Sequence, residues 1–297
     1  MKRGSALVLV GLGALLLGSR GGGSVSTHSG PVVPSSALPE NYSRDELHKL
    51  RARWNDPAIR AAVLKWRDRL FPRVPITAMI AAGVTSTSRH ERGGPPDYAT
   101  GLWGVEWPRV ERWARDERTM RELGRAIPTE PTAFAHDVEA QAYAGFRSYA
   151  EHLAGATRGW PGEIIPREGS QWLYRVALAS YSSGEGKVSK IARAALDRIA
   201  QAGERGAWRA IGQAIVDAYN GGARQFGGVD ISGRWDAAHL VVRNEGRFQS
   251  GMVLAQDVAD DETAPSADRE LARAELNWYA DGWLSPELSR ALAAAAG

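Results

Sequence analysis

The sequence of 297 residues contains no cysteine. This absence excludes a disulfide framework, a thiolate metal site and a lipid anchor attached through a cysteine side chain. The few histidines also lack the close spacing that is typical of metal ligands; they are His28, His48, His90, His136, His152 and His239. We therefore expect no metal ion and no cofactor in this protein.

The excess of one sign of charge over the other is small as well. The 37 basic and 34 acidic residues give a net charge of only +3. Both signs alternate in stretches such as PRVERWARDERTMRELGR at 108–125. That pattern is typical of a solvated helix face and not of a basic stripe that binds nucleic acid, so we expect no nucleic-acid partner.

Long apolar runs are limited to the amino terminus. Lys2 and Arg3 precede an apolar run from Ala6 to Leu17, which is short for a membrane span and suits the central region of an export signal. No clear cleavage site follows, so residues 1–18 are either a signal peptide or an uncleaved membrane anchor. The Gly-, Ser- and Pro-rich residues 19–41 are then a flexible linker. We expect an exported protein of the periplasm or cell envelope whose only membrane contact is through this segment.

Strand patterns are nearly missing from the remaining chain, whereas helix signals recur. Asp56 before Pro57 predicts a helix start, and Pro75 opens an apolar stripe with helical spacing. Further helices are expected at about 108–126, 136–154, 170–181, 187–202, 206–219, 267–281 and 285–296, with one short β-hairpin around HLVV at 239–242. The predicted fold is mainly α: a multi-helix globular domain over 42–205 and a partly glycine-rich C-terminal extension of unknown role over 206–297.

Three motifs follow one another along the chain: PITAMIAAGVTS at 75–86, TGLWGVEWP at 100–108 and VALASYSSGEGKV at 176–188. A helix-like stretch, HDVEAQAYAGFRSYAEHLAG, stands between the last two. Together they resemble the landmarks of lysozyme-like lytic transglycosylases and goose-type lysozymes. The resemblance covers roughly residues 57–200, about half of the chain, and each motif alone is weak.

The resemblance implies an enzyme that cleaves the β-1,4 bond between MurNAc and GlcNAc in peptidoglycan, whose glycan strands would be the partner. In that family a glutamate at the end of a buried helix is the acid, a glycine-containing loop places backbone beside the sugar, and a tyrosine flanks both. Carried over residue by residue, the substrate-binding set is Thr85, Ser86, Gly101, Trp103, Glu106, Tyr181 and Ser182. A second copy of the third motif, DAYNGG at 217–222, leaves Tyr219 as an alternative to Tyr181.

The expected acid is missing, because Thr85 stands where the family has glutamate and a hydroxyl is too weak a proton donor at neutral pH. Glu91 is the nearest carboxyl in the sequence and our predicted catalytic residue, with Asp97 and Glu106 as other candidates. Each of the three is otherwise an ordinary solvated charge. Two further departures, Trp103–Gly104 for methionine–glutamine and Ser182 for asparagine, also fall at positions that face the ligand.

Two functions therefore stay open. The first is an exported enzyme that cuts glycan strands with an atypical acid. The second is a catalytically inactive lysozyme-like protein that binds peptidoglycan or serves as a structural component of an envelope or virion assembly. A helical adaptor whose motifs match by chance is the third and least specific interpretation.

Overall fold

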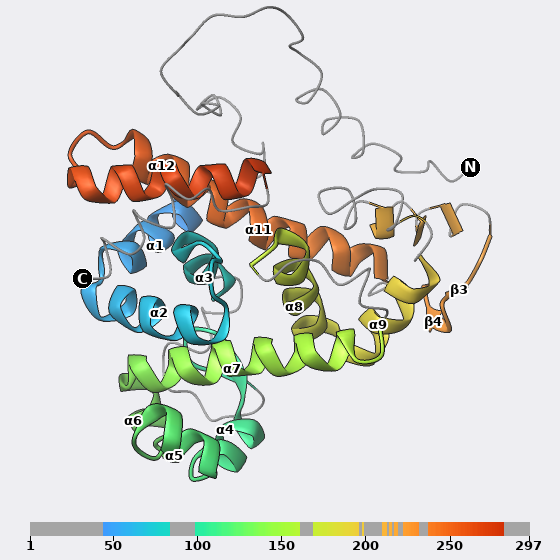
Figure 1. Ribbon diagram of the computed structural model, residues 1–297, viewed down its shortest axis with the longest axis horizontal. Helices are drawn as coiled ribbons and strands as arrows, with labels where there is room; N and C mark the ends of the chain where they lie inside the picture. Colours follow the sequence, from blue (N-terminus) through green and yellow to red (C-terminus); the bar gives the residue numbers. More distant parts are fainter. Residues whose placement is uncertain are drawn as a thin grey trace, which may run out of the picture. The chain divides into compact units, whose positions relative to one another are not determined.

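The computed structural model describes residues 44–83, 99–160, 169–195, 222–231 and 237–281, with single positions between 198 and 218. These residues are predominantly helical, which confirms the mainly α class (Figure 1). The strands are short: β1 (Ala99–Thr100) pairs antiparallel with β2 (Val105–Glu106), and β3 (Gln225–Phe226) pairs antiparallel with β4 (Val229–Asp230). The predicted signal or anchor at 1–18, the linker at 19–41 and the helix at 285–296 lie outside the described residues.

The first helices are α1 (Arg44–Asn55), α2 (Pro57–Leu70) and α3 (Ile76–Ala82). The predicted start of α2 is confirmed: the Asp56 carboxylate accepts hydrogen bonds from the backbone N–H groups of Ala58 and Ile59 at 2.9 and 3.2 Å. Pro57 occupies the first turn, where its missing N–H costs nothing. Every residue of α3 is buried, as its apolar composition indicated.

The middle of the chain forms α4 (Trp107–Trp113), α5 (Glu117–Leu123), α6 (Pro131–His136), α7 (Val138–Thr157), α8 (Gln171–Ser183) and α9 (Glu185–Ala194). The single helix expected at 108–126 is wrong, because the chain breaks between α4 and α5. There Asp116 caps α5 by accepting a hydrogen bond from Thr119 N at 2.6 Å. The long α7 packs against α2 and α8, and α4 to α6 lie on its other side (Figure 1).

The final described helices are α11 (Ala237–Asp260) and α12 (Ser266–Asp281), the second as predicted. The hairpin expected around HLVV is wrong, since these residues belong to α11. Farther along α11, the buried residues Gly251, Leu254 and Val258 recur at helical spacing. The observed hairpin lies earlier, where Gly227 and Gly228 both adopt positive φ in the turn between β3 and β4.

Helices from both ends of the described chain share the main core. α11 crosses α3 closely enough that a Cβ on Gly251 would lie 2.9 Å from the Ala78 Cα. On α12, Trp278 is fully buried and Glu275 caps the start of α3. The segment whose role was unknown thus supplies two helices to the core that surrounds α3. A second apolar cluster joins the end of α7 to α8, α9 and β4.

None of the helices in the described ranges combines the length and the apolarity needed to cross a lipid bilayer.

Candidate functional site

The described structure places part of the predicted site. Thr85, Ser86, Glu91 and Asp97 fall within residues 84–98 and Tyr219 within 219–221, all outside the described ranges. The predicted residues that the structure does describe are Gly101, Trp103, Glu106, Tyr181 and Ser182.

The loop between β1 and β2 lies directly against the end of α3. A Cβ on Gly83 would lie 2.5 Å from the carbonyl oxygen of Leu102, so this contact requires glycine. The indole of Trp103 donates a hydrogen bond to the Met79 carbonyl at 3.0 Å and is only 3% exposed. Its indole therefore packs the loop against α3. The contact of the loop with Gly83 is made by the backbone of Leu102.

Gly101, at the start of the same loop, has a positive φ of 75°. The neighbouring Leu102 N–H donates to the Gln141 side-chain oxygen of α7 at 2.7 Å. On the other side, α7 leaves room for Trp103, because a Cβ on Gly145 would lie 2.6 Å from the Trp103 Cβ. Gly145, which lies within the helix-like stretch, thus leaves room for the tryptophan of the second motif.

Tyr181, near the end of α8, joins the third motif to the other two. Its hydroxyl lies 3.1 Å from the Trp103 carbonyl oxygen and also bonds to the Gly104 carbonyl oxygen. Its ring meets Tyr149 edge-on, with centroids 4.7 Å apart, and the Tyr149 hydroxyl donates to the Ala82 carbonyl at 3.3 Å. Burial raises the pKa of Tyr181, so its hydroxyl stays protonated and donates at neutral pH.

A second set of polar side chains borders Tyr181. Glu106 forms an ion pair with Arg109 at 2.9 Å. The His152 ring lies edge-on to Tyr181, with centroids 5.7 Å apart, and its Nδ1 lies 3.6 Å from a carboxylate oxygen of Glu185. Burial, followed by the positive charge of Arg109, lowers the pKa of His152, which is therefore neutral at pH 7.

Sequence reasoning missed three of these residues. Arg247 comes from α11 and donates to the Ser182 hydroxyl at 3.0 Å, but α11 was not predicted. His152 carried a detectable signal, because it follows Gly145 and Tyr149 at the helical spacing of seven and three residues and shares their face. Glu185 stood in the sequence GEGK, which gave no indication of a partner on α7.

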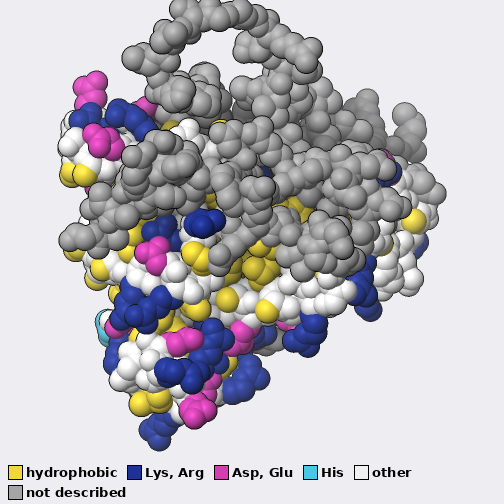
Figure 2. All heavy atoms as spheres, viewed as in Figure 1, with side chains coloured by type: hydrophobic (Ala, Val, Ile, Leu, Met, Phe, Trp, Pro, Cys, Tyr) yellow, Lys and Arg dark blue, Asp and Glu magenta, His cyan; other side chains and the backbone are white. Residues whose placement is uncertain are grey.

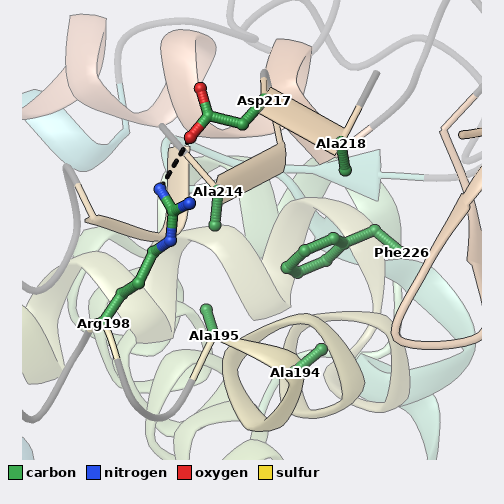
Figure 3. A pocket seen from close by; sticks show the side chains of 7 residues that line it. All are labelled: Ala194, Ala195, Arg198, Ala214, Asp217, Ala218 and Phe226. Carbon is green, nitrogen blue, oxygen red and sulfur yellow. Dashed lines mark hydrogen bonds and ion pairs between the residues drawn. The ribbon is translucent and has the colours of Figure 1, made fainter. Parts of the chain in front are cut away.

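Two cavities lie away from this cluster. One, of about 460 Å³, is lined mostly by alanine side chains, with an Arg198–Asp217 ion pair of 2.7 Å and Phe226 at its wall (Figure 3). The other, of about 310 Å³, is mainly apolar and is lined by residues such as Leu70, Phe71 and Leu173. Neither cavity is lined by Tyr181.

Charge and metal chemistry add little in the described part of the chain. On the face drawn in Figure 2, basic and acidic side chains mingle over the region of α4 to α6. Among the described residues, no three histidine, aspartate or glutamate side chains gather closely enough to hold a metal ion. No protein-family model, curated protein or solved structure matches this chain.

Proposed function

We propose that this protein is an exported enzyme of the periplasm or cell envelope that cleaves the glycan strands of peptidoglycan. The bond would be the β-1,4 link between MurNAc and GlcNAc, cut as by a lytic transglycosylase or muramidase with an atypical acid. One observation carries the proposal: Tyr181 bonds to the backbone of the loop at 101–104 at the point where this loop abuts the end of α3. The three motifs, far apart in the sequence, thus meet in one place.

The chemistry around Tyr181 suits a sugar chain. A glycan offers many hydroxyl groups, and such ligands are held by a few convergent polar side chains beside an aromatic ring. Glu106, Ser182 and His152 lie near Tyr181, and Glu185 lies beside His152; they supply donors and acceptors of this kind. Trp103 is turned inward, so the loop meets Tyr181 through its backbone carbonyl oxygen atoms.

Cleavage also needs a proton for the leaving oxygen. We propose Glu91 as the group that supplies it, because it is the carboxyl nearest in sequence to Thr85. Glu106 is the alternative, since it belongs to the second motif and its charge acts on the Tyr181 phenol. Its carboxylate is already engaged in the ion pair with Arg109, which makes it the second choice.

A second candidate function is glycan binding without turnover, in an envelope or virion assembly. Two observations favour it: a threonine stands at the family's acid position, and the nearby Glu106 is already paired with Arg109. The framework around α3 and Tyr181 would then serve only to hold the strand.

Digestion of purified peptidoglycan by the full chain tests the proposal, with soluble muropeptides identified by mass spectrometry. We expect products from the unmodified protein and from Glu106→Gln, and none from Glu91→Gln. Anhydro products would indicate transglycosylation, whereas reducing ends would indicate hydrolysis.

No products from the unmodified protein, together with activity gained in Thr85→Glu, would replace the enzyme with the binding protein. Cosedimentation with insoluble peptidoglycan separates the remaining outcomes. A protein that neither cleaves nor sediments would contradict both functions.

A further inference from the structure

The polar pair beside Tyr181 has features that glycan binding alone does not require. His152 is 7% exposed, and its buried Nδ1 has no hydrogen-bond partner among the described residues. A buried polar atom without a partner is costly and calls for a reason. A carboxylate oxygen of Glu185 lies 3.6 Å from this nitrogen.

The fold makes room for this carboxylate. A Cβ on Gly155 would overlap the carboxyl group of Glu185. The α7 helix therefore has no side chain at the point where the Glu185 side chain of α9 lies against it. Glu185 is the first residue of α9, and its side chain is half exposed. The distance of 3.6 Å between the two side chains is only slightly longer than a hydrogen bond.

We propose that His152 is the general base of the proposed reaction and that Glu185 is its positioning residue. Glu185 would accept the Nδ1 proton and thereby fix the tautomer in which Nε2 is free to take a proton. A neutral imidazole oriented by a carboxylate is the arrangement that activates hydroxyl nucleophiles in many hydrolases. This inference rests on the proposed function, because it concerns the same glycan cleavage.

The step balances as follows. A hydroxyl of the sugar attacks the anomeric carbon, so that an oxygen–carbon bond forms while the bond from that carbon to the leaving oxygen breaks. His152 takes the proton of the attacking hydroxyl, and the carboxyl acid gives a proton to the leaving oxygen. Loss of the proton from His152 to solvent, and uptake of a proton by the carboxylate from solvent, restore both groups. In this scheme the acid and the base are separate groups, whereas one carboxyl serves as both in the lytic transglycosylases that the motifs resemble.

The charges around His152 set the pH at which it acts. They come from each element packed against it, namely Glu185 on α9, Arg109 on α4, Glu106 on β2, Glu151 on α7 itself and the Tyr181 phenol on α8. Burial and Arg109 favour the neutral imidazole, whereas the three carboxylates favour the charged one. Loss of the Glu185 charge should therefore move the acid limb of the rate profile to lower pH.

The test measures peptidoglycan cleavage by the full chain between about pH 4 and pH 9. We expect His152→Gln and Glu185→Gln to lower kcat by about 10²-fold to 10⁴-fold, with the acid limb lost or shifted, and Glu185→Asp to recover part of the rate. The matched control is Glu117→Gln, because Glu117 is likewise exposed and is the first residue of its helix, α5. This control should retain full activity.

The outcomes separate this inference from the proposed function. If the unmodified protein cleaves peptidoglycan while both variants keep their rate and pH profile, the inference is wrong and the proposed function stands. A lower rate with an unchanged pH profile would assign the pair a purely structural role and would also overturn it. No cleavage by the unmodified protein at any pH overturns both. If His152→Gln fails to fold, the half-exposed Glu185 decides.

Discussion

We expect the Glu275→Ala substitution to lower the free energy of unfolding by about 2 to 6 kcal/mol, because it strands two buried backbone donors. Pro75, which precedes α3, provides no side-chain cap. The Glu275 carboxylate replaces that cap by accepting hydrogen bonds from the N–H groups of Ile76 at 2.6 Å and Thr77 at 3.1 Å. It is fully buried, so water cannot take its place.

The magnitude follows from these contacts. Each buried donor left without an acceptor costs about 1 to 3 kcal/mol. The Thr77 hydroxyl also bonds to Glu275, at 2.7 Å, but keeps the Tyr279 hydroxyl at 3.0 Å as a second partner and is not counted. Glu275→Gln retains one acceptor oxygen and should therefore cost about half as much as Glu275→Ala.

Urea unfolding followed by circular dichroism measures the difference as a shift in midpoint at constant slope. The control is Glu270→Ala on the same helix, an exposed position where we expect a change within about 0.5 kcal/mol. Equal stabilities for Glu275→Ala and Glu270→Ala would refute the role of α12 as the cap of α3.

The same residue predicts a pH dependence. Burial raises the pKa of Glu275, although hydrogen bonds from Thr77 and Ile76 and the charge of Arg67 oppose the shift. The folded state thus holds this proton more tightly than the unfolded chain does. Its contribution to stability is complete below the ordinary carboxyl pKa and is lost as the pH rises through the raised value. Glu275→Gln should flatten this decline.

The remaining predictions concern packing and a second carboxylate. Gly145→Ala brings a methyl group against Trp103 and should lower the free energy of unfolding by about 1 to 3 kcal/mol. Gly186→Ala places its methyl group in open space and should raise the free energy of unfolding by up to about 1 kcal/mol. Equal melting temperatures for the two variants would contradict the contact between Gly145 and Trp103. Although burial acts to raise it, hydrogen bonds from Arg147 hold the pKa of Asp116 at about 2. The stabilisation that Asp116 provides is present above the ordinary carboxyl pKa. It is lost as the pH falls from there through the folded-state pKa of about 2. Asp116→Asn should therefore flatten acid unfolding, and parallel curves for both proteins would contradict this reasoning.

Local signals predicted the helices that depend on local chemistry. Asp56 with Pro57 marked the start of α2, and the apolar run after Pro75 marked the buried α3. The helix α11 escaped prediction, because HLVV is rich in residues that favour strands. What the sequence could not reveal is the close crossing of α11 over α3, where Gly251 meets Ala78. Tertiary packing there overrides local preference.

The site divides in the same way. Tyr181 and the loop around Trp103 were predicted because a known motif order pointed to them, and the structure brings them into contact. His152 and Glu185 stand within the quoted stretches but had no assigned role there, and Arg247 lies outside them. They reach Tyr181 only because α7, α9 and α11 converge there, which is a property of helix packing and not of spacing along the chain.

The cap on α3 joins residues 199 positions apart in the chain. A nascent protein therefore leaves α3 without its native cap until residue 275 has emerged from the ribosome, long after α1 and α2 are complete. Since the end of α3 supports the loop that meets Tyr181, synthesis of α12 is the event that allows the candidate site to form. We therefore expect α3 to reach its native packing late in synthesis.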